Sequence, residues 1–481
     1  MPLNINDLPY EIFSTILEVA AAINSRDVPR YTYGLSQAPE PMRDPPIQRF
    51  IRGQASPGVI RWNASKSIRQ VGRKWHDWAI SYALKDLHIS RWRGSERWAQ
   101  LYTLNPFNEP PSSFAVYQDP YCSLKKTLHL FDSCNSLASC VRKIWFHGYD
   151  TAKTNAMIFR VLRHCDNLDV VTLPWTAVRY GHPLAWSHVL GRNIRGQSIS
   201  SLEFLAVNLK QSQKSDPDDQ FDLKPLRSPL VNFSGLRRLK IFGHSDFMPL
   251  TDDDLIAISR TASNLREIHI TGTSTTSIVG MSALINSSNK TLEVLEHTPL
   301  TADGFDHPDP MESPSLQDHL CPTILHCHKL RDLSISMPSV CENFFADYSV
   351  NWSGDLQIRT GTVCGGHPDS LKTSGAVRAQ FWRVLNQARR LMFSRKQAGS
   401  SLNVEIFVGD WIFEPRHHRV HGDFQVPDLL SAGAWPEDKV PSLKGPYGQT
   451  GLYGKYGSYD HISEGSFKEG LRKGYVSFSA L

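Results

Sequence analysis

The amino-acid sequence predicts an α/β solenoid, a curved sheet with outer helices, preceded by a small helical module. One apolar spacing, in which two residues and then one residue separate three apolar positions, recurs seven times, and helical periodicity precedes several recurrences. Because side chains alternate faces along a strand, the last two apolar residues of each triplet point the same way. A short strand that returns every 27 to 38 residues is typical of solenoids. The triplets are Val141–Ile144–Phe146, Leu168–Val171–Leu173, Leu202–Leu205–Val207, Leu236–Leu239–Ile241, Leu265–Ile268–Ile270, Leu292–Leu295–His297 and Leu330–Leu333–Ile335. The third position is not apolar in one of them, at His297.

The N-terminal module is expected to consist of two amphipathic helices. Residues 5 to 22 carry apolar residues at helical spacing, with Asp7 as the expected cap. A second helix is expected from Ile68 to Tyr82, and a proline-rich loop insertion at residues 24 to 60 separates the two. The triplet Leu84, Leu87 and Ile89 follows directly, which places the first solenoid strand there.

The remaining chain divides into an array and a tail. Residues 158 to 165 and 255 to 262 show helical spacing before their strands, so each unit is a helix, a tight turn and a strand. A long helix after residue 370 and a strand at residues 401 to 413 are expected to close the array. The predicted domains are therefore residues 1–90, residues 91–425 and a poorly ordered Gly- and Tyr-rich tail at residues 426–481.

The composition limits the partners and the compartment. The 481 residues include 52 Lys and Arg against 47 Asp and Glu, a net charge of +5. This balance gives no reason to expect nucleic acid or a membrane surface as a partner. No apolar run approaches 18 residues and the first residues lack a signal sequence. With eight scattered cysteines, we expect an intracellular protein, cytoplasmic or nuclear, with reduced thiols.

The sequence offers two weak candidates for chemistry. Cys321, His326, Cys327 and His328 have no second cysteine pair at zinc-ligand spacing, and buried residues beside a strand explain them better. His417, His418 and His421, with Glu414 and Asp423, could form a metal or acid–base site, but a solvated loop is the favoured interpretation. We therefore expect no catalytic residue, no metal, no cofactor and no enzyme activity.

Two stretches carry a resemblance to known families. LPYEIFSTIL (residues 8–17), joined to SIRQVGRKWHDWAISYALKDLHIS (residues 67–90), resembles an F-box. Residues 250–273, 164–173 and 327–336 resemble leucine-rich repeats. The combination resembles fungal F-box proteins with an irregular leucine-rich-repeat solenoid and covers most of residues 5 to 425. Two departures are the insertion that splits the F-box and the missing Asn or Cys after the repeat strands.

This resemblance implies that the N-terminal helices bind the Skp-type adaptor, and through it the cullin, of an E3 ubiquitin ligase. The residues that would supply the apolar contact are Leu8, Pro9, Ile12, Ile16 and Leu17. A small helical module that leaves an apolar patch bare needs a partner to cover it. The alternative, that these residues pack on Val71, Trp75 and Trp78, remains open.

The strand positions between the last two apolar residues should point away from the core, onto the concave face. They are Trp145, Thr172, Ala206, Lys240, His269 and Ser334. Of these, Trp145, Thr172, Lys240 and His269 are the predicted target-binding residues, with Trp145 first because exposed aromatics contribute most at interfaces. Arg237, Arg238 and Lys240 suggest a local basic patch suited to an acidic or phosphorylated segment. The alternative is a mixed, solvated face.

The predicted function is that of a non-catalytic substrate-recognition subunit of a Skp–cullin–F-box ubiquitin ligase, whose repeats bind an unknown target protein. A leucine-rich-repeat interaction scaffold outside ubiquitin transfer is the second reading, and an enzyme built on the histidine cluster is the third.

Overall fold

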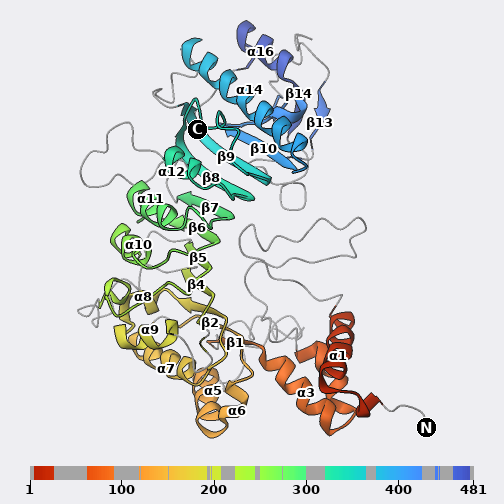
Figure 1. Cartoon of the computed structure of the whole chain (residues 1–481), viewed down its shortest axis with the longest axis vertical. Coiled ribbons are helices and arrows are strands. Elements are labelled where there is room, and N and C mark those ends of the chain that lie inside the picture. Colours follow the sequence, from red (N-terminus) through yellow and green to blue (C-terminus); the bar gives the residue numbers. More distant parts are fainter. Residues whose placement is uncertain are drawn as a thin grey trace, which may run out of the picture. The chain divides into compact units, whose positions relative to one another are not determined.

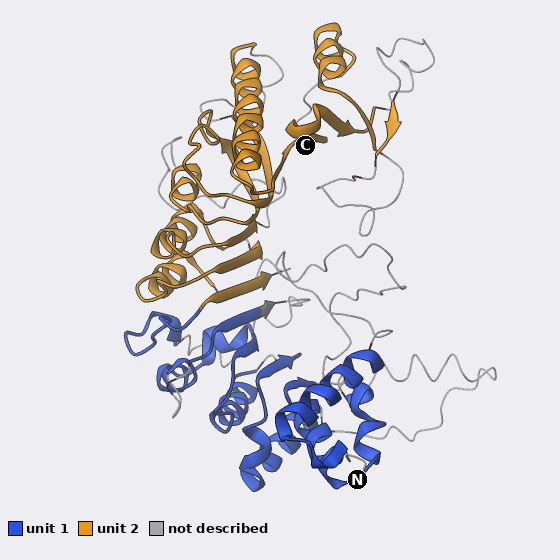
Figure 2. Cartoon of the chain, turned by 45° about the vertical axis from the view of Figure 1, so that its right-hand side comes forward, with its two compact units in different colours: residues 1–206, 210–236 blue, residues 207–209, 237–481 orange. Residues whose placement is uncertain are grey.

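The computed structural model describes residues 5–25, 62–91, 119, 121–149, 151–191, 196, 198–206, 223–243, 250–273, 275–299, 320–363, 375–424, 439–442, 444 and 459–476. The chain forms two compact units, the first made of residues 1–206 and 210–236, the second of residues 207–209 and 237–481 (Figure 2). Most of the predicted insertion at residues 24–60 and the Gly-rich residues 445–458 lie outside the described residues.

The first unit begins with the expected helical module. It contains η1 (Ile5–Asp7), α1 (Tyr10–Asn24), η3 (Ile68–Gln70) and α3 (Arg73–Leu84). The helices share one small core, in which the Phe13 and Trp75 rings meet edge to face with centroids 5.5 Å apart. The Trp78 indole donates to the Ser14 hydroxyl at 2.9 Å. The helix α1 starts later than predicted because Asp7 belongs to η1 and Pro9, which suits a helix start, precedes the first turn.

Four parallel strands follow in the first unit, in chain order. They are β1 (Asp86–Ser90), β2 (Lys143–His147), β3 (Val170–Pro174) and β4 (Ser201–Ala206). The intervening helices are α5 (Cys122–Ser133), α6 (Asn135–Ala138), α7 (Ala152–Arg163), α8 (Thr176–Tyr180) and α9 (Pro183–Leu190), with η6 (Pro225–Arg227) after β4. A capping box of Thr151 and Thr154 begins α7.

The predicted triplet at β4 is wrong by three residues. In the sheet, Leu202 is the partner of Val171 and Phe204 is the partner of Leu173. The buried triplet is therefore Ile199, Leu202 and Phe204, not Leu202–Leu205–Val207. The local sequence satisfies the spacing in both frames, and only pairing with β3 selects one. On the strand face, the residue beside Thr172 is therefore Glu203, where Ala206 was predicted.

The second unit contains six parallel strands in chain order. They are β5 (Arg238–Gly243), β6 (Glu267–Thr273), β7 (Val294–Pro299), β8 (Asp332–Val340), β9 (Gly354–Val363) and β10 (Leu402–Val408). The helices α10 (Asp252–Ser259), α11 (Ile278–Ser287) and α12 (Cys321–Leu325) lie along one side of these strands (Figure 1). The predicted α/β class with repeated helix–strand units is confirmed at this level.

The end of the second unit is antiparallel. The strands β11 (Trp411–Glu414), β12 (Arg419–Gly422), β14 (Asp460–Ser463) and β13 (Val440–Pro441) extend the sheet beyond β10 in that spatial order. The predicted long helix is α14 (Gly375–Gln397); η7 (Pro415–His417) and α16 (Glu464–Lys473) complete this end.

Part of the predicted C-terminal tail is folded. Residues 459 to 476 form β14 and α16, and β14 pairs with β12. Phe467 on α16 is buried against Trp411 and Phe413, with ring centroids 5.2 and 5.3 Å away. Sequence reasoning missed this element because its buried apolar residues, Ile462 and Phe467, lie close to a long Gly- and Tyr-rich stretch. In the described part of the chain, no helix combines the length and hydrophobicity required to cross a bilayer.

Candidate functional site

The helix α1 is apolar on two faces. Phe13, Leu17 and Ala21 face the core of the module and are buried. A second set of aliphatic residues follows one stripe at i, i+4, i+7 and i+11 and stays exposed. These are Ile12, Ile16, Val19 and Ile23, with exposed fractions of 51, 40, 56 and 52%. We call them the α1 stripe. The module's own core covers only one of the two apolar faces.

The five predicted adaptor-binding residues divide between these faces. Ile12 and Ile16 belong to the α1 stripe, Pro9 is exposed, and Leu8 is half-buried against the module core. Leu17 is only 1% exposed, so its predicted partner contact is corrected: this side chain holds the module together. The reason is its position one turn after Phe13 on the core-facing side.

The alternative partners for these residues also divide. Trp75 and Trp78 pack in the module core, as that reading requires. Val71, by contrast, is itself 62% exposed and is not part of that core. Sequence reasoning missed Ile23 because the helix was expected to stop at residue 22, whereas α1 continues to Asn24 and extends the stripe by one turn.

The four predicted target-binding residues lie at the expected strand positions but are not exposed. Trp145 pairs in register with Thr172 across β2 and β3, and Lys240 pairs with His269 across β5 and β6. All four side chains are buried, with exposed fractions from 4 to 9%. The expectation of an open face with an exposed Trp145 is therefore wrong.

Cross-strand pairing uses the polar groups on this face. The Thr172 hydroxyl donates to the Glu203 carboxylate at 2.9 Å. In the second unit, His269 Nδ1 lies 2.8 Å from the Glu296 carboxylate. Such side-chain pairs between neighbouring strands stabilise the sheet. A single strand's sequence does not reveal them, because each partner comes from a neighbouring strand.

The predicted basic patch on β5 is largely neutralised. Arg238 makes two hydrogen bonds, both 2.6 Å long, to the carboxylate of Glu267 on β6. Lys240 is buried, and only Arg237 of the three remains exposed. The run of positive charge in the sequence is therefore not a run of free positive charge on the strand face.

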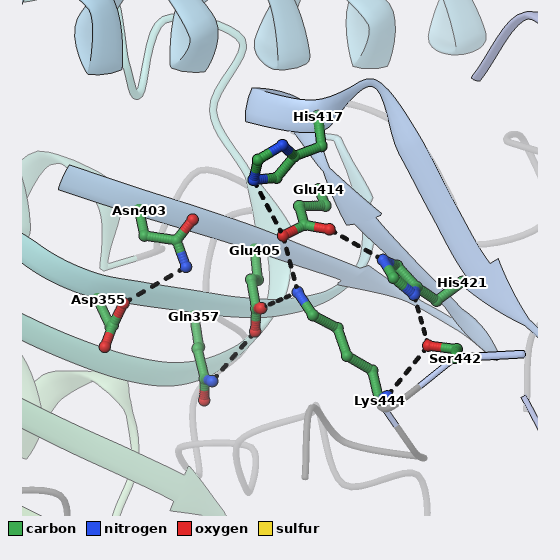
Figure 3. A network of polar contacts seen from close by, with 9 residues as sticks. All are labelled: Asp355, Gln357, Asn403, Glu405, Glu414, His417, His421, Ser442 and Lys444. Atoms are coloured by element: carbon green, nitrogen blue, oxygen red, sulfur yellow. Dashed lines mark hydrogen bonds and ion pairs between the residues drawn. The ribbon is translucent and has the colours of Figure 1, made fainter. Parts of the chain in front are cut away.

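The antiparallel end of the second unit holds a polar network (Figure 3). Glu414 on β11 contacts His421 Nε2 on β12 at 3.0 Å and Lys444 Nζ at 3.2 Å. Lys444 also pairs with Glu405 on β10, which accepts a hydrogen bond from Gln357 on β9 at 3.2 Å. The network thus links the last parallel strands to the antiparallel ones.

The charge on Glu414 is stabilised inside the network. The hydrogen bond from His421 lowers the pKa of Glu414 to about 2, helped by the charge and hydrogen bond of Lys444 and opposed by burial. His421 is buried on a strand, so the solvated-loop interpretation is wrong for this residue; His417 and His418 are exposed. The difference follows from backbone pairing, because His421 lies on β12 between β11 and β14, whereas His417 and His418 precede that strand.

The order of groups at His421 is hydroxyl, imidazole and carboxylate. Ser442 Oγ lies 2.6 Å from His421 Nδ1, while Nε2 faces Glu414. A hydroxyl placed in this way could lose its proton to the imidazole. However, Ser442 Oγ also accepts the backbone N–H of Lys444 at 3.0 Å. The contacts therefore hold Ser442 and Lys444 beside the sheet.

The cysteine Cys327 of the other predicted cluster, and Cys165 at the matching position before another strand, are structural. Burial raises the pKa of both the Cys165 and Cys327 thiols to about 12. The indole of Trp352 donates to the carbonyl of Cys327 at 2.7 Å. Both residues lie just before a strand, as the favoured interpretation requires. Among the residues described, no group of three or more His, Cys, Asp or Glu side chains is placed to hold a metal ion.

Of these arrangements, the α1 stripe can bind another molecule without first breaking contacts inside the chain. The polar groups of the strand-face pairs, and those of the network around Glu414, are already hydrogen-bonded or ion-paired within the chain. Neither a scan against protein-family models nor a search of curated proteins gives a match to the chain.

Proposed function

We propose that this protein is a substrate-recognition subunit of a Skp–cullin–F-box ubiquitin ligase. In this proposal the N-terminal module is an F-box that docks on a Skp-type adaptor, and the helix–strand array is a leucine-rich-repeat solenoid that holds a target protein. The observation that carries the proposal is the α1 stripe, four exposed aliphatic side chains on a helix whose opposite face is already buried.

The size of the stripe supports a docking role. Covering the exposed half of one Ile or Val side chain contributes about 1 kcal/mol, so the four together contribute about 4 kcal/mol. An isolated exposed aliphatic residue is ordinary, but four in one continuous helical row form the kind of patch that partners cover. Pro9 is exposed at the start of the same helix and extends the surface.

In this proposal the helix–strand array holds the target protein close to the ubiquitin-carrying enzyme. A solenoid binds extended partners because successive units present one continuous surface. Bringing a target lysine close to a ubiquitin-carrying enzyme raises the local concentration of the two reactants, so the receptor itself needs no catalytic group. This role is compatible with an array whose buried polar pairs serve folding.

Capture of the adaptor tests the proposal. The full-length chain carrying Ile12→Asp and Ile16→Asp should lose co-purification with a Skp-type adaptor while retaining its circular dichroism spectrum, since both side chains are exposed. Leu130→Asp with Val279→Asp places the same two charges on exposed aliphatic positions of α5 and α11, outside the module, and should keep binding.

Two results would count against this assignment. Unchanged capture by the double variant would remove the stripe from the interface, and no capture by the unmodified chain would remove the adaptor. Adaptor binding without any change in target abundance after deletion would instead favour the scaffold function outside ubiquitin transfer.

A further inference from the structure

A cavity of about 850 Å³ opens in the second unit between α14, the turn after it and η7. Its lining comes from one continuous stretch of the chain and one short helix that follows the next strands. The lining residues are Arg389, Arg390, Met392, Phe393, Lys396, Gly399, Ser400, Ser401, Leu402, Pro415, Arg416 and His418. The volume is within the range of sites for small molecules, about 300 to 1,000 Å³.

The cavity is lined by positive charge without a carboxylate. Arg390, Lys396 and Arg416 are exposed at its rim, and the structure gives none of their side chains a hydrogen bond or ion pair with another described residue. These three cations would attract an anion, and an arginine fork matches a phosphate with two parallel hydrogen bonds.

A fourth cation of the lining, Arg389, contacts other residues of the chain and fixes the cavity wall. Arg389 donates from Nε to the Pro415 carbonyl at 3.0 Å and from Nη1 to Asn386 at 2.6 Å. It also forms an ion pair with Glu464 on α16. These contacts join α14 to η7, so the two walls of the cavity are set before any ligand arrives.

The floor of the same cavity is apolar. Met392, Leu402 and Pro415 are buried beneath it, and Phe393 stands at its edge with 64% of its surface exposed. An inorganic ion would leave this apolar surface wet, and a neutral apolar molecule would leave the three cations unpaired. The lining therefore suits a molecule that combines a negatively charged group with an apolar body.

We propose that this cavity binds a small organic anion, a phosphate monoester attached to an aromatic or branched aliphatic body. The phosphate contacts Arg390, Lys396 and Arg416, and the apolar body covers Phe393 and the floor. This binding is independent of the adaptor-docking role, because it uses neither α1 nor the strand face.

Calorimetric titration of the full-length chain tests the proposal with 1-naphthyl phosphate as the probe. We expect saturable one-to-one binding of 1-naphthyl phosphate, and binding of 1-naphthol and of inorganic phosphate at least about tenfold weaker. Each rim cation changed to glutamine should weaken binding about fivefold, the effect of one charge contact near 4 Å in water. The combined Arg390→Gln, Lys396→Gln and Arg416→Gln variant should weaken it about a hundredfold.

Two further variants separate the parts of the site. Phe393→Ser should weaken 1-naphthyl phosphate and leave the response to inorganic phosphate unchanged. Arg383→Gln removes a cation of the same helix that pairs with Glu342 outside the cavity, and should bind as the unmodified chain does. Absence of saturation at about 1 mM probe, equal binding of 1-naphthol, or full binding by the triple variant would each overturn the proposal.

Discussion

Replacing His297 by leucine should remove a pH-dependent loss of stability from the second unit. His297 occupies the third apolar position of its triplet, in register with Ile270 and Ile335, and has no exposed surface. Burial lowers the pKa of His297 from 6.5 to about 4, although its contact with the Ile270 carbonyl at 2.8 Å acts in the opposite direction.

The sign of the effect follows from the two pKa values of this residue. Between pH 6.5 and about 4 the unfolded chain takes up a proton at His297 and the folded chain does not, so lowering the pH favours unfolding. The loss is about 2 kcal/mol at pH 5 relative to pH 7.5, and it approaches about 3 kcal/mol below pH 4. Above pH 7 the contribution is absent.

Urea unfolding followed by circular dichroism measures this difference. At pH 7.5, His297→Leu should lie within about 1 kcal/mol of the unmodified chain, because a new apolar contact offsets one lost hydrogen bond. At pH 5 the variant should be the more stable by about 2 kcal/mol beyond that baseline. Burial and the neighbouring His147 also lower the pKa of His88 to about 4. Because His88 is present in both chains, its contribution cancels in the difference between them.

The exposed His326 provides the control, since His326→Leu should follow the pH dependence of the unmodified chain. Parallel pH profiles for His297→Leu and the unmodified chain would refute the argument that burial of this imidazole limits acid stability.

Three other substitutions should change stability in ways set by single contacts. Glu414→Gln should lower the free energy of unfolding by about 2 to 3 kcal/mol at pH 7, and the deficit should shrink as the pH falls from 4.5 towards 2, measured by urea unfolding at pH 7 and pH 3. Gly354→Ala should cost about 1 to 3 kcal/mol in thermal unfolding, because φ is +70° and a Cβ would meet the Arg331 carbonyl. Thr172→Val should cost about 1 to 3 kcal/mol by removing the hydroxyl that donates to the buried Glu203 carboxylate, whereas Thr172→Ser should recover most of the loss.

The repeated units could be predicted from the sequence because the side chains that each strand buries must be apolar, so apolar residues recur at a fixed spacing. Leu239 and Ile268 lie side by side in register, as do Ile241 and Ile270, which is what the recurring triplet requires. The frame at β4 could not be predicted in the same way. Around Leu202 two overlapping triplets satisfy one spacing, and only hydrogen bonding to β3 decides between them.

The division of α1 into two faces marks a second limit. Ile16 and Leu17 are adjacent aliphatic residues with the same helical preference, yet Leu17 is buried and Ile16 is exposed. Their difference comes from which side α3 occupies, and this is a tertiary contact. The buried state of His421 has the same origin, because β14 pairs with its strand from about 40 residues later in the chain.

The two proposed docking surfaces differ in what binding must displace. A partner that covers the α1 stripe meets exposed aliphatic groups, so nearly all of the apolar area it removes from water contributes to affinity. A target that reaches the strand face at His269 or Thr172 meets buried groups already hydrogen-bonded to Glu296 and Glu203. Breaking a buried hydrogen bond of this kind costs about 1 to 3 kcal/mol. Under the proposed function, adaptor binding should therefore be rapid, whereas engagement of the strand face must first separate these side-chain pairs and should associate more slowly.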